Sequence, residues 1–153
     1  MRNMAWRLTT DDGFTLEEIP AADIRLAYQW IESDLYEIIE KSYADWIPAD
    51  IYASLKAGTA TLSMGYTKNQ QYVGFLVTSL IHDAGGEPTL FVWAAHQDYR
   101  HHYKEQVFDF LEQIAGELGA VSIEFHSSRP GWERVASRHG FEVVAKIYKR
   151  DLI

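Results

Sequence analysis

Leu90-Phe91-Val92-Trp93-Ala94 is a short apolar stretch, rich in residues that favour strands, and it decides the fold class. The polar residues 96–103 follow it without periodicity. From Lys104 onwards apolar side chains recur at the spacing of one helix face, and Gly119 ends that helix. The predicted buried face consists of Val107, Leu111, Ile114 and Leu118.

A second strand follows this helix. Val121-Ser122-Ile123-Glu124-Phe125 alternates between apolar and polar side chains, as a strand does. Strands joined through a helix are usually parallel neighbours with a right-handed crossover, so residues 89–94 and 121–125 are predicted to pair in parallel. Pro130 suits the first turn of a further helix, which Gly140 closes, and residues 141–150 are predicted to form a last strand.

The first half of the chain predicts a strand, helices and a three-stranded meander. Residues 14–19 alternate as a strand, and two helical stretches follow from Pro20. Asp50 is predicted to cap a short helix that ends at Gly58. Polar turns then separate three apolar segments, which predicts antiparallel pairing between neighbours. These segments are residues 59–66, 71–81 and 89–94.

Composition excludes several classes of function. The 153 residues, 47% hydrophobic and 24% charged, fit one globular domain with its own core. A formal net charge of −8 argues against non-specific binding to nucleic acid. The lack of cysteine excludes disulfides, thiolate catalysis and zinc–thiolate sites. No apolar run suggests a membrane span or a signal peptide, so we expect no membrane partner and a chain that stays where it is made.

Six histidines raise the question of a metal site. None of them forms an H-x-x-x-H or H-E-x-x-H pattern, in which two side chains share one helix face. The adjacent His101 and His102 would point about 100° apart on a helix, which makes a shared ion difficult. We predict no metal site.

The element order resembles that of the GNAT (GCN5-related N-acetyltransferase) fold. Gly119-Ala120 before a strand, and residues 134–140 leading to Gly140-Phe141, resemble the C-terminal half of that fold. The resemblance implies a single α/β domain over residues 1–153. Its central sheet would be mixed, with an antiparallel meander, parallel C-terminal strands and helices on both faces.

The resemblance also implies a cofactor loop. In GNAT proteins the loop before the helix that follows the fourth strand binds the acyl-CoA pyrophosphate and typically reads Q/R-x-x-G-x-G/A. The matching register here is Arg100, His101, His102, Tyr103, Lys104 and Glu105. Arg100 fits, but Tyr103 and Glu105 occupy the two small-residue positions, where glycine would let a phosphate approach the backbone. The positive charges and hydrogen-bond donors of Arg100, His101, His102 and Lys104 offset this in part. The simpler interpretation, which we favour, is a polar loop that only connects the strand to the helix. We predict weak or no binding of acetyl-CoA.

The resemblance also implies catalytic residues. GNAT enzymes use a base for the attacking amine and usually a tyrosine acid four residues before the glycine of the Gly-Phe pair. Ala136 occupies that position here, and Tyr148 lies on the predicted last strand. Glu124 and His126 are the candidate bases. The simpler interpretation of Glu124, which we favour, is an exposed carboxylate on a strand.

Two tryptophans are candidates for a binding role. Trp93, near the end of the fourth strand, and Trp132, at the start of the last helix, could flank the cleft where the fourth and fifth strands of this fold separate. Both side chains are more simply read as part of the core.

A narrower resemblance concerns small GNAT-like proteins of tailed bacteriophages. The stretches that carry it are residues 46–50, 58–62 and 131–135. The missing loop glycines and the missing tyrosine favour a catalytically degenerate protein that acts by binding a protein partner. The phage resemblance implies an accessory or virion component, with a partner such as a phage structural protein, in the cytoplasm of a bacterial host or in the virion. A homo-oligomer fits this interpretation, and no cofactor is expected. The alternative is an acyl-CoA-dependent N-acetyltransferase with an atypical pyrophosphate loop, which uses acetyl-CoA.

Overall fold

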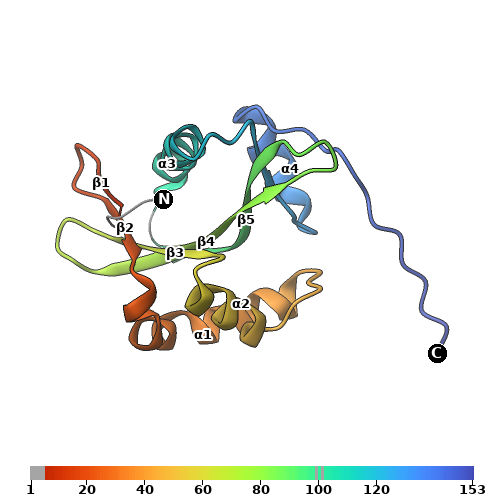
Figure 1. The fold of residues 1–153 in the computed structure, drawn as a ribbon, viewed down its shortest axis with the longest axis horizontal. Helices are drawn as coiled ribbons and strands as arrows, with labels where there is room; N and C mark the ends of the chain where they lie inside the picture. The colour runs from red at the N-terminus through yellow and green to blue at the C-terminus, as the bar shows by residue number, and fades with distance from the viewer. Residues whose placement is uncertain (1–5, 99, 101) are drawn as a thin grey trace.

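The computed structural model describes residues 6–98, 100 and 102–153. They form six strands and four α-helices around one sheet (Figure 1). In chain order these are β1 (Arg7–Thr9), β2 (Thr15–Ile19), the 3-10 turn η1 (Ala21–Asp23), α1 (Ile24–Lys41), α2 (Pro48–Ala57), β3 (Thr61–Tyr66), β4 (Tyr72–His82), β5 (Pro88–Gln97), α3 (Lys104–Glu117), β6 (Ser122–Phe125) and α4 (Pro130–Arg138).

The sheet has the predicted mixed topology. Its strands follow the order β1-β2-β3-β4-β5-β6. All neighbouring pairs are antiparallel except β5 and β6, which are parallel. The predicted meander and the parallel pairing of residues 89–94 with 121–125 are both confirmed. The strand β1 was not predicted, and it forms a hairpin with β2 across the turn that ends at Gly13.

Helices cover both faces of the sheet, as predicted. Figure 1 shows α1 and α2 on one face and α3 on the other. Adjacent residues of β4 point to opposite faces, so that Val77 belongs to the core under α1 and α2, whereas Leu76 belongs to the core under α3. The first core also includes Ile31 and Leu35, which are fully buried. Two cores separated by one sheet are therefore the basis of the fold.

The helices begin and end where the sequence indicates, with two differences. The two predicted helical stretches after Pro20 form one continuous helix, α1. Asp50 does not cap α2 from outside but lies inside its first turn, where its carboxylate accepts a hydrogen bond from the backbone N–H of Ile47 at 3.0 Å. Gly58 ends α2 with a φ of 78°, which L-residues rarely adopt.

Within the described residues, none of the helices has the length and apolar character that a bilayer crossing requires.

Gly74 sets how closely β4 approaches β5. A Cβ atom at this position would lie 2.2 Å from the backbone oxygen of His96 and 3.0 Å from the Cα of Gln97. A side chain there would force the two strands apart. Glycine is therefore required at the point where β5 ends and the candidate site begins.

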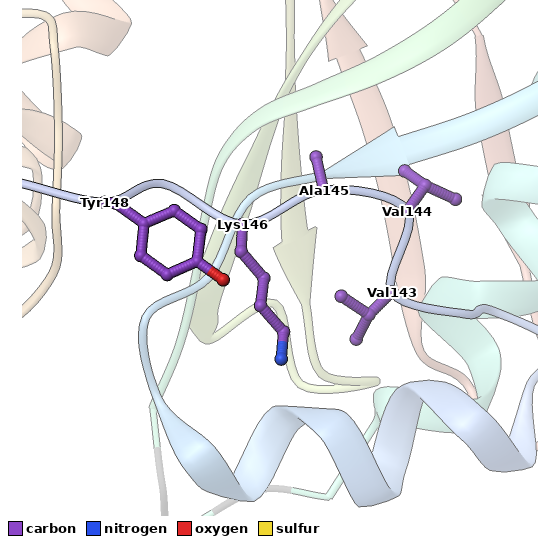
Figure 2. Close-up of a pocket in the computed structure, with 5 residues that line it drawn as sticks. All are labelled: Val143, Val144, Ala145, Lys146 and Tyr148. Carbon is purple, nitrogen blue, oxygen red and sulfur yellow. The ribbon is translucent and has the colours of Figure 1, made fainter.

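The predicted last strand at residues 141–150 is wrong. Residues 141–153 contain no strand, and Figure 1 shows this segment running away from the domain. A strand is stable only when a neighbouring strand satisfies its backbone groups, and no described strand pairs with this segment. A shallow hollow in this region is lined only by the segment itself, through Val143, Val144, Ala145, Lys146 and Tyr148 (Figure 2).

A partly buried polar cluster lies between α1 and the ends of β4 and β5. His96 Nε2 is 3.6 Å from Asp34 Oδ1. Burial raises the pKa of Asp34, and the carboxylate of Glu37 raises it further, whereas His96 lowers it. Burial, the nearby Asp34 and Tyr66 raise the pKa of Tyr72. No described residue forms a hydrogen bond with the buried hydroxyl of Tyr72.

The buried face of α3 predicts a specific loss of stability. Leu111 is 4% exposed, whereas its neighbour Glu112 lies in solvent. We expect Leu111→Ala to lower the free energy of unfolding by about 2–5 kcal/mol, because it leaves a cavity in a packed core. Urea unfolding of this variant and of the control Glu112→Ala measures the difference. A loss below about 1 kcal/mol for Leu111→Ala would show that the helix face is assigned incorrectly.

Replacement of Tyr72 and of Tyr28 by phenylalanine should change the stability of the fold in opposite directions. We expect Tyr72→Phe to stabilise the fold by about 1 kcal/mol, because it removes a buried hydroxyl that has no described partner. Tyr28→Phe should instead cost about 0.5–1.5 kcal/mol, because the Tyr28 hydroxyl donates a hydrogen bond to the Pro48 carbonyl at 3.2 Å. Thermal and urea unfolding of both variants tests this pair. A destabilised Tyr72→Phe variant would show that the hydroxyl has an acceptor.

Candidate functional site

The strands β5 and β6 separate at one end of the sheet. They pair only from Thr89 and Ser122 to Val92 and Phe125. Beyond that point β6 has ended, whereas β5 continues to Gln97. No described strand pairs with the β6-facing side of residues 93–96, so the backbone groups of these residues can bind a ligand there.

A β-bulge marks the point of separation. Val77 pairs with Ala94 and Thr78 pairs with Val92, so Trp93 is an extra residue without a partner in β4. A bulge of this kind changes the direction of side chains and increases the local twist. Trp93 and Ala94 consequently both pack with the core under α1 and α2.

The two tryptophan candidates do not lie together. The Trp93 ring packs edge-on against the Trp46 ring, with ring centres 6.4 Å apart, in the core under α1 and α2. Trp132 instead contacts Phe125, whose ring packs with the core under α3, at 5.7 Å. Both rings are partly buried. The structure therefore favours the interpretation of both rings as parts of packed layers on opposite faces.

Glu124 and His126, the two base candidates, do lie together at the separation. Glu124 Oε1 is 3.0 Å from His126 Nε2, and both side chains reach solvent. Glu124 is opposite Phe91 in the parallel register, and the His126 ring lies 5.0 Å from the Phe91 ring. An imidazole beside a carboxylate, both reaching solvent, can accept a proton from a nucleophile.

The connection between α1 and α2 borders this pair. The backbone N–H of Tyr43 donates a hydrogen bond to Ser128 Oγ at 3.2 Å, which joins this connection to the segment after β6. The end of the sheet where β5 and β6 separate therefore lies close to the connection between α1 and α2, which is distant in sequence.

The predicted pyrophosphate loop has an internal ion pair. Arg100 Nη2 is 2.7 Å from Asp98 Oδ2, and Arg100 Nε is 3.1 Å from Asp98 Oδ1. The Arg100 backbone N–H also donates to Asp98 Oδ1 at 3.0 Å. His102 is exposed, and His101 lies outside the described residues. The residue that fits the family pattern is therefore already paired with a carboxylate.

Tyr103 does not project from the loop as the sequence suggests. Its ring stacks on Phe14 with ring centres 4.2 Å apart and planes 8° from parallel. It packs with the core under α3. The steric argument against a phosphate near this residue therefore loses its premise, while the weak binding itself stays a prediction.

The first turn of α3 has the properties of an anion site. Val107 N donates to Tyr103 O at 3.0 Å and makes the first intrahelical bond, so the N–H groups of residues 104–106 have no acceptor within the helix. The Tyr103 side chain does not cap them. Lys104 places its ammonium group 5.4 Å from the Trp132 ring centre in the same region. Free amides, the helix dipole and one cation all favour an anion here.

The Glu105 carboxylate repels an anion at the first turn of α3 less directly than its position in the sequence suggests. Its carboxylate lies 3.3 Å from His139 Nε2, at the C-terminal end of α4. His139 is 18% exposed and stacks on Phe108 at 4.0 Å. The Glu105 side chain is thus directed towards α4, although 78% of it remains exposed.

Sequence reasoning missed the contacts that give this site its form. Only the short spacing between Asp98 and Arg100 could have suggested their ion pair. Nothing in the sequence indicates the bulge at Trp93 or the contact of Glu105 with His139. In the part of the chain that the structure describes, no three His, Asp or Glu side chains gather as metal ligands would.

Comparison with solved structures shows the fold. A possible acetyltransferase from Clostridium difficile 630 superposes with a TM-score of 0.64, at 10% sequence identity over 92% of this chain and 98% of that chain. An aminoglycoside acetyltransferase, meta-AAC0020, from a soil metagenomic sample gives 0.63 at 14% identity over 92% and 99%. The ribosomal-protein-alanine N-acetyltransferase of Brucella melitensis gives 0.60 at 12% identity over 92% and 99%.

Comparison of sequences adds nothing to this result. No protein-family model matches the chain, and no curated protein matches it either. At 10–14% identity the structural likeness shows the architecture and not the activity. The chain has the GNAT fold of these acetyltransferases.

Proposed function

We propose that this protein is an acyl-CoA-dependent N-acyltransferase. The observation that carries the proposal is the separation of β5 and β6 beside the first turn of α3. It places residues 93–96 of β5, which have no described strand neighbour on the β6-facing side, next to the helix N–H groups that have no acceptor within α3. In open α/β sheets, ligands bind at the carboxyl ends of the strands, where neighbouring connections diverge. The GNAT fold of the structural neighbours supports the same site.

The residues present fit an acyl-CoA in part. The amides of residues 104–106 and the ammonium of Lys104 would hold the pyrophosphate, and the β6-facing side of β5 would bind the extended pantetheine arm. Tyr103 is packed in the core, so its ring does not cover the helix end. Two features oppose binding, since Arg100 is paired with Asp98 and the Glu105 carboxylate remains near the site.

Glu124 and His126 supply the acid–base chemistry in this proposal. A bound acyl-CoA contributes a thioester whose acyl group an amine can take. His126 accepts a proton from that amine, and Glu124 holds the imidazole in position. Ala136 leaves α4 without the usual tyrosine acid. Without that acid, the CoA sulfur would leave as a thiolate and take its proton from solvent.

The second candidate function is the binding of a protein partner by a catalytically inactive domain. It is favoured by the lack of loop glycines and by the occupied guanidinium of Arg100. The structural neighbours named above are acetyltransferases, and they lend no support to a phage or virion role. A measurement of acetyl-CoA binding separates the two functions.

Binding of acetyl-CoA to the full chain is the first test. We expect acetyl-CoA at about 100 times its Kd to add about 2.7 kcal/mol of stability, which corresponds to a Tm increase of about 5–10 °C. Lys104→Glu should weaken the affinity at least about tenfold, since it removes a charge-assisted contact worth about 1.5–3 kcal/mol. Glu105→Gln should strengthen the affinity, because it removes a negative charge from the site.

The matched control is Lys68→Glu, which makes the same charge change at an exposed turn between β3 and β4. Its affinity should equal that of the wild type. The proposal is contradicted if the wild type shows neither a Tm shift nor calorimetric heat at millimolar acetyl-CoA, and partner binding then becomes the better explanation.

Acyl transfer is the second test. We expect release of free CoA thiol when acetyl-CoA is mixed with a suitable amine from a panel. The panel contains an aminoglycoside and an alanine-terminated peptide, because the named neighbours act on such amines. His126→Asn and Glu124→Gln should each lower kcat, by up to about 10²–10⁴-fold for the base, without changing the acetyl-CoA Tm shift.

His82→Asn is the control, because His82 is an exposed histidine at the opposite end of the sheet. Equal activity of the His82 and His126 variants would remove His126 from the mechanism. Binding of acetyl-CoA without turnover of any amine would show a cofactor-binding domain that lacks catalysis.

A further inference from the structure

The C-terminal segment, residues 142–153, has the composition of a strand. Val143, Val144, Ile147 and Tyr148 are β-branched or aromatic, and such residues favour strands. All four side chains are exposed, by 58%, 79%, 65% and 89%. Consecutive large apolar residues in solvent are unusual for an isolated domain and mark an interaction surface.

The backbone of this segment is already extended. Lys149 Nζ lies 3.4 Å from Asp151 Oδ1, so two side chains that are two residues apart point to the same side. Figure 2 shows the same relation for Lys146 and Tyr148, which point to one side of the chain, whereas Val144 and Ala145 both point to the other side. Residues 146–151 therefore have the two-residue spacing of an extended chain, which Val144 and Ala145 do not share.

The sheet ends in a strand with one open side. Among the described residues β6 pairs only with β5, which leaves the outward backbone groups of Ser122–Phe125 without a strand partner. Val121, just before β6, is 65% exposed. An exposed edge of this kind is a template for another strand. We call it the β6 edge.

We propose that the C-terminal segment of one copy pairs with the β6 edge of a second copy, and that the second copy returns the same contact. The proposal does not depend on the acyltransferase function. A two-fold exchange of this kind satisfies both edges and covers both segments in one closed dimer. At about 3.3 Å per residue the segment reaches roughly 40 Å, which is enough to cross to a neighbouring domain.

The connection at Phe141 favours a second copy over the chain's own edge. The Phe141 ring is held between Phe108 at 5.7 Å and Phe125 at 5.2 Å. Gly140, with a φ of 83°, fixes the turn before it. From this anchor the segment leaves the domain and does not fold back along β6 (Figure 1).

Charge favours the same pairing. The segment carries three basic residues, Lys146, Lys149 and Arg150, against two acidic residues, Glu142 and Asp151. The whole chain has a formal net charge of −8, so the rest of the domain is strongly acidic. Opposite net charges favour association of the segment with the body of a second copy.

The first experiment measures the mass of the full chain in solution by sedimentation and light scattering. We expect a dimer for the wild type, and a dimer dissociation constant at least about tenfold weaker for Ile147→Asp and for Val143→Asp. Leu26→Asp is the matched control, because Leu26 on α1 is 68% exposed and Ile147 is 65% exposed. In an isolated chain both changes are harmless, so only an exchanged dimer distinguishes them.

The second experiment uses the lack of native cysteine to locate the contact. Two chains of different mass are refolded together, one with Ser122→Cys in β6 and the other with one cysteine placed in turn at positions 143–148. A disulfide needs Cα atoms roughly 4.4–6.8 Å apart, so oxidation should link the two different chains at one or more positions. A monomeric wild type, a dimer insensitive to Ile147→Asp, or the lack of a disulfide between the two different chains at every tested position would each overturn the proposal.

Discussion

The short parallel contact between β5 and β6 determines the rest of this structure. It extends over four register pairs and ends at Val92 and Phe125. The parallel direction requires a crossover, and α3 supplies it, so the helix must lie on one face of the sheet. The early end of the contact leaves β5 alone for its last residues, and α3 begins close to that point. The candidate site is therefore a consequence of where the pairing stops.

Much of this architecture could be predicted from the sequence, because its elements are locally encoded. The helical spacing of Leu111 and Ile114 identified the face of α3 that is buried. The strand β1 was missed because its three residues are too few for a periodic pattern, and the C-terminal segment was misassigned because its composition is that of a strand. Composition reports the preference of a segment, whereas pairing depends on a partner that the sequence does not name.

The candidate site could be predicted less completely, and the reason is tertiary. Glu124 and His126 were named from the sequence as separate candidate bases on and just after a strand, and only the structure shows that they are in contact. The direction of Tyr103 depends on Phe14, which is distant in the chain, and that of Glu105 depends on His139. No local pattern contains those contacts. What Tyr103 and Glu105 do to cofactor binding therefore depends on contacts that a comparison of motif letters does not contain.

The β6 strand belongs both to the candidate site and to the proposed dimer contact, because its two edges have different roles. Its inner edge separates from β5 after Val92, and its outer edge has no strand partner among the described residues. Because β6 is a four-residue strand with one strand neighbour, a strand added to its outer edge would hold Glu124 more firmly in place. In the proposed dimer the C-terminal segment of a second copy holds β6 from outside. Dimer formation and the geometry of the Glu124–His126 pair are then coupled through one strand, without contact between the segment and the pair itself.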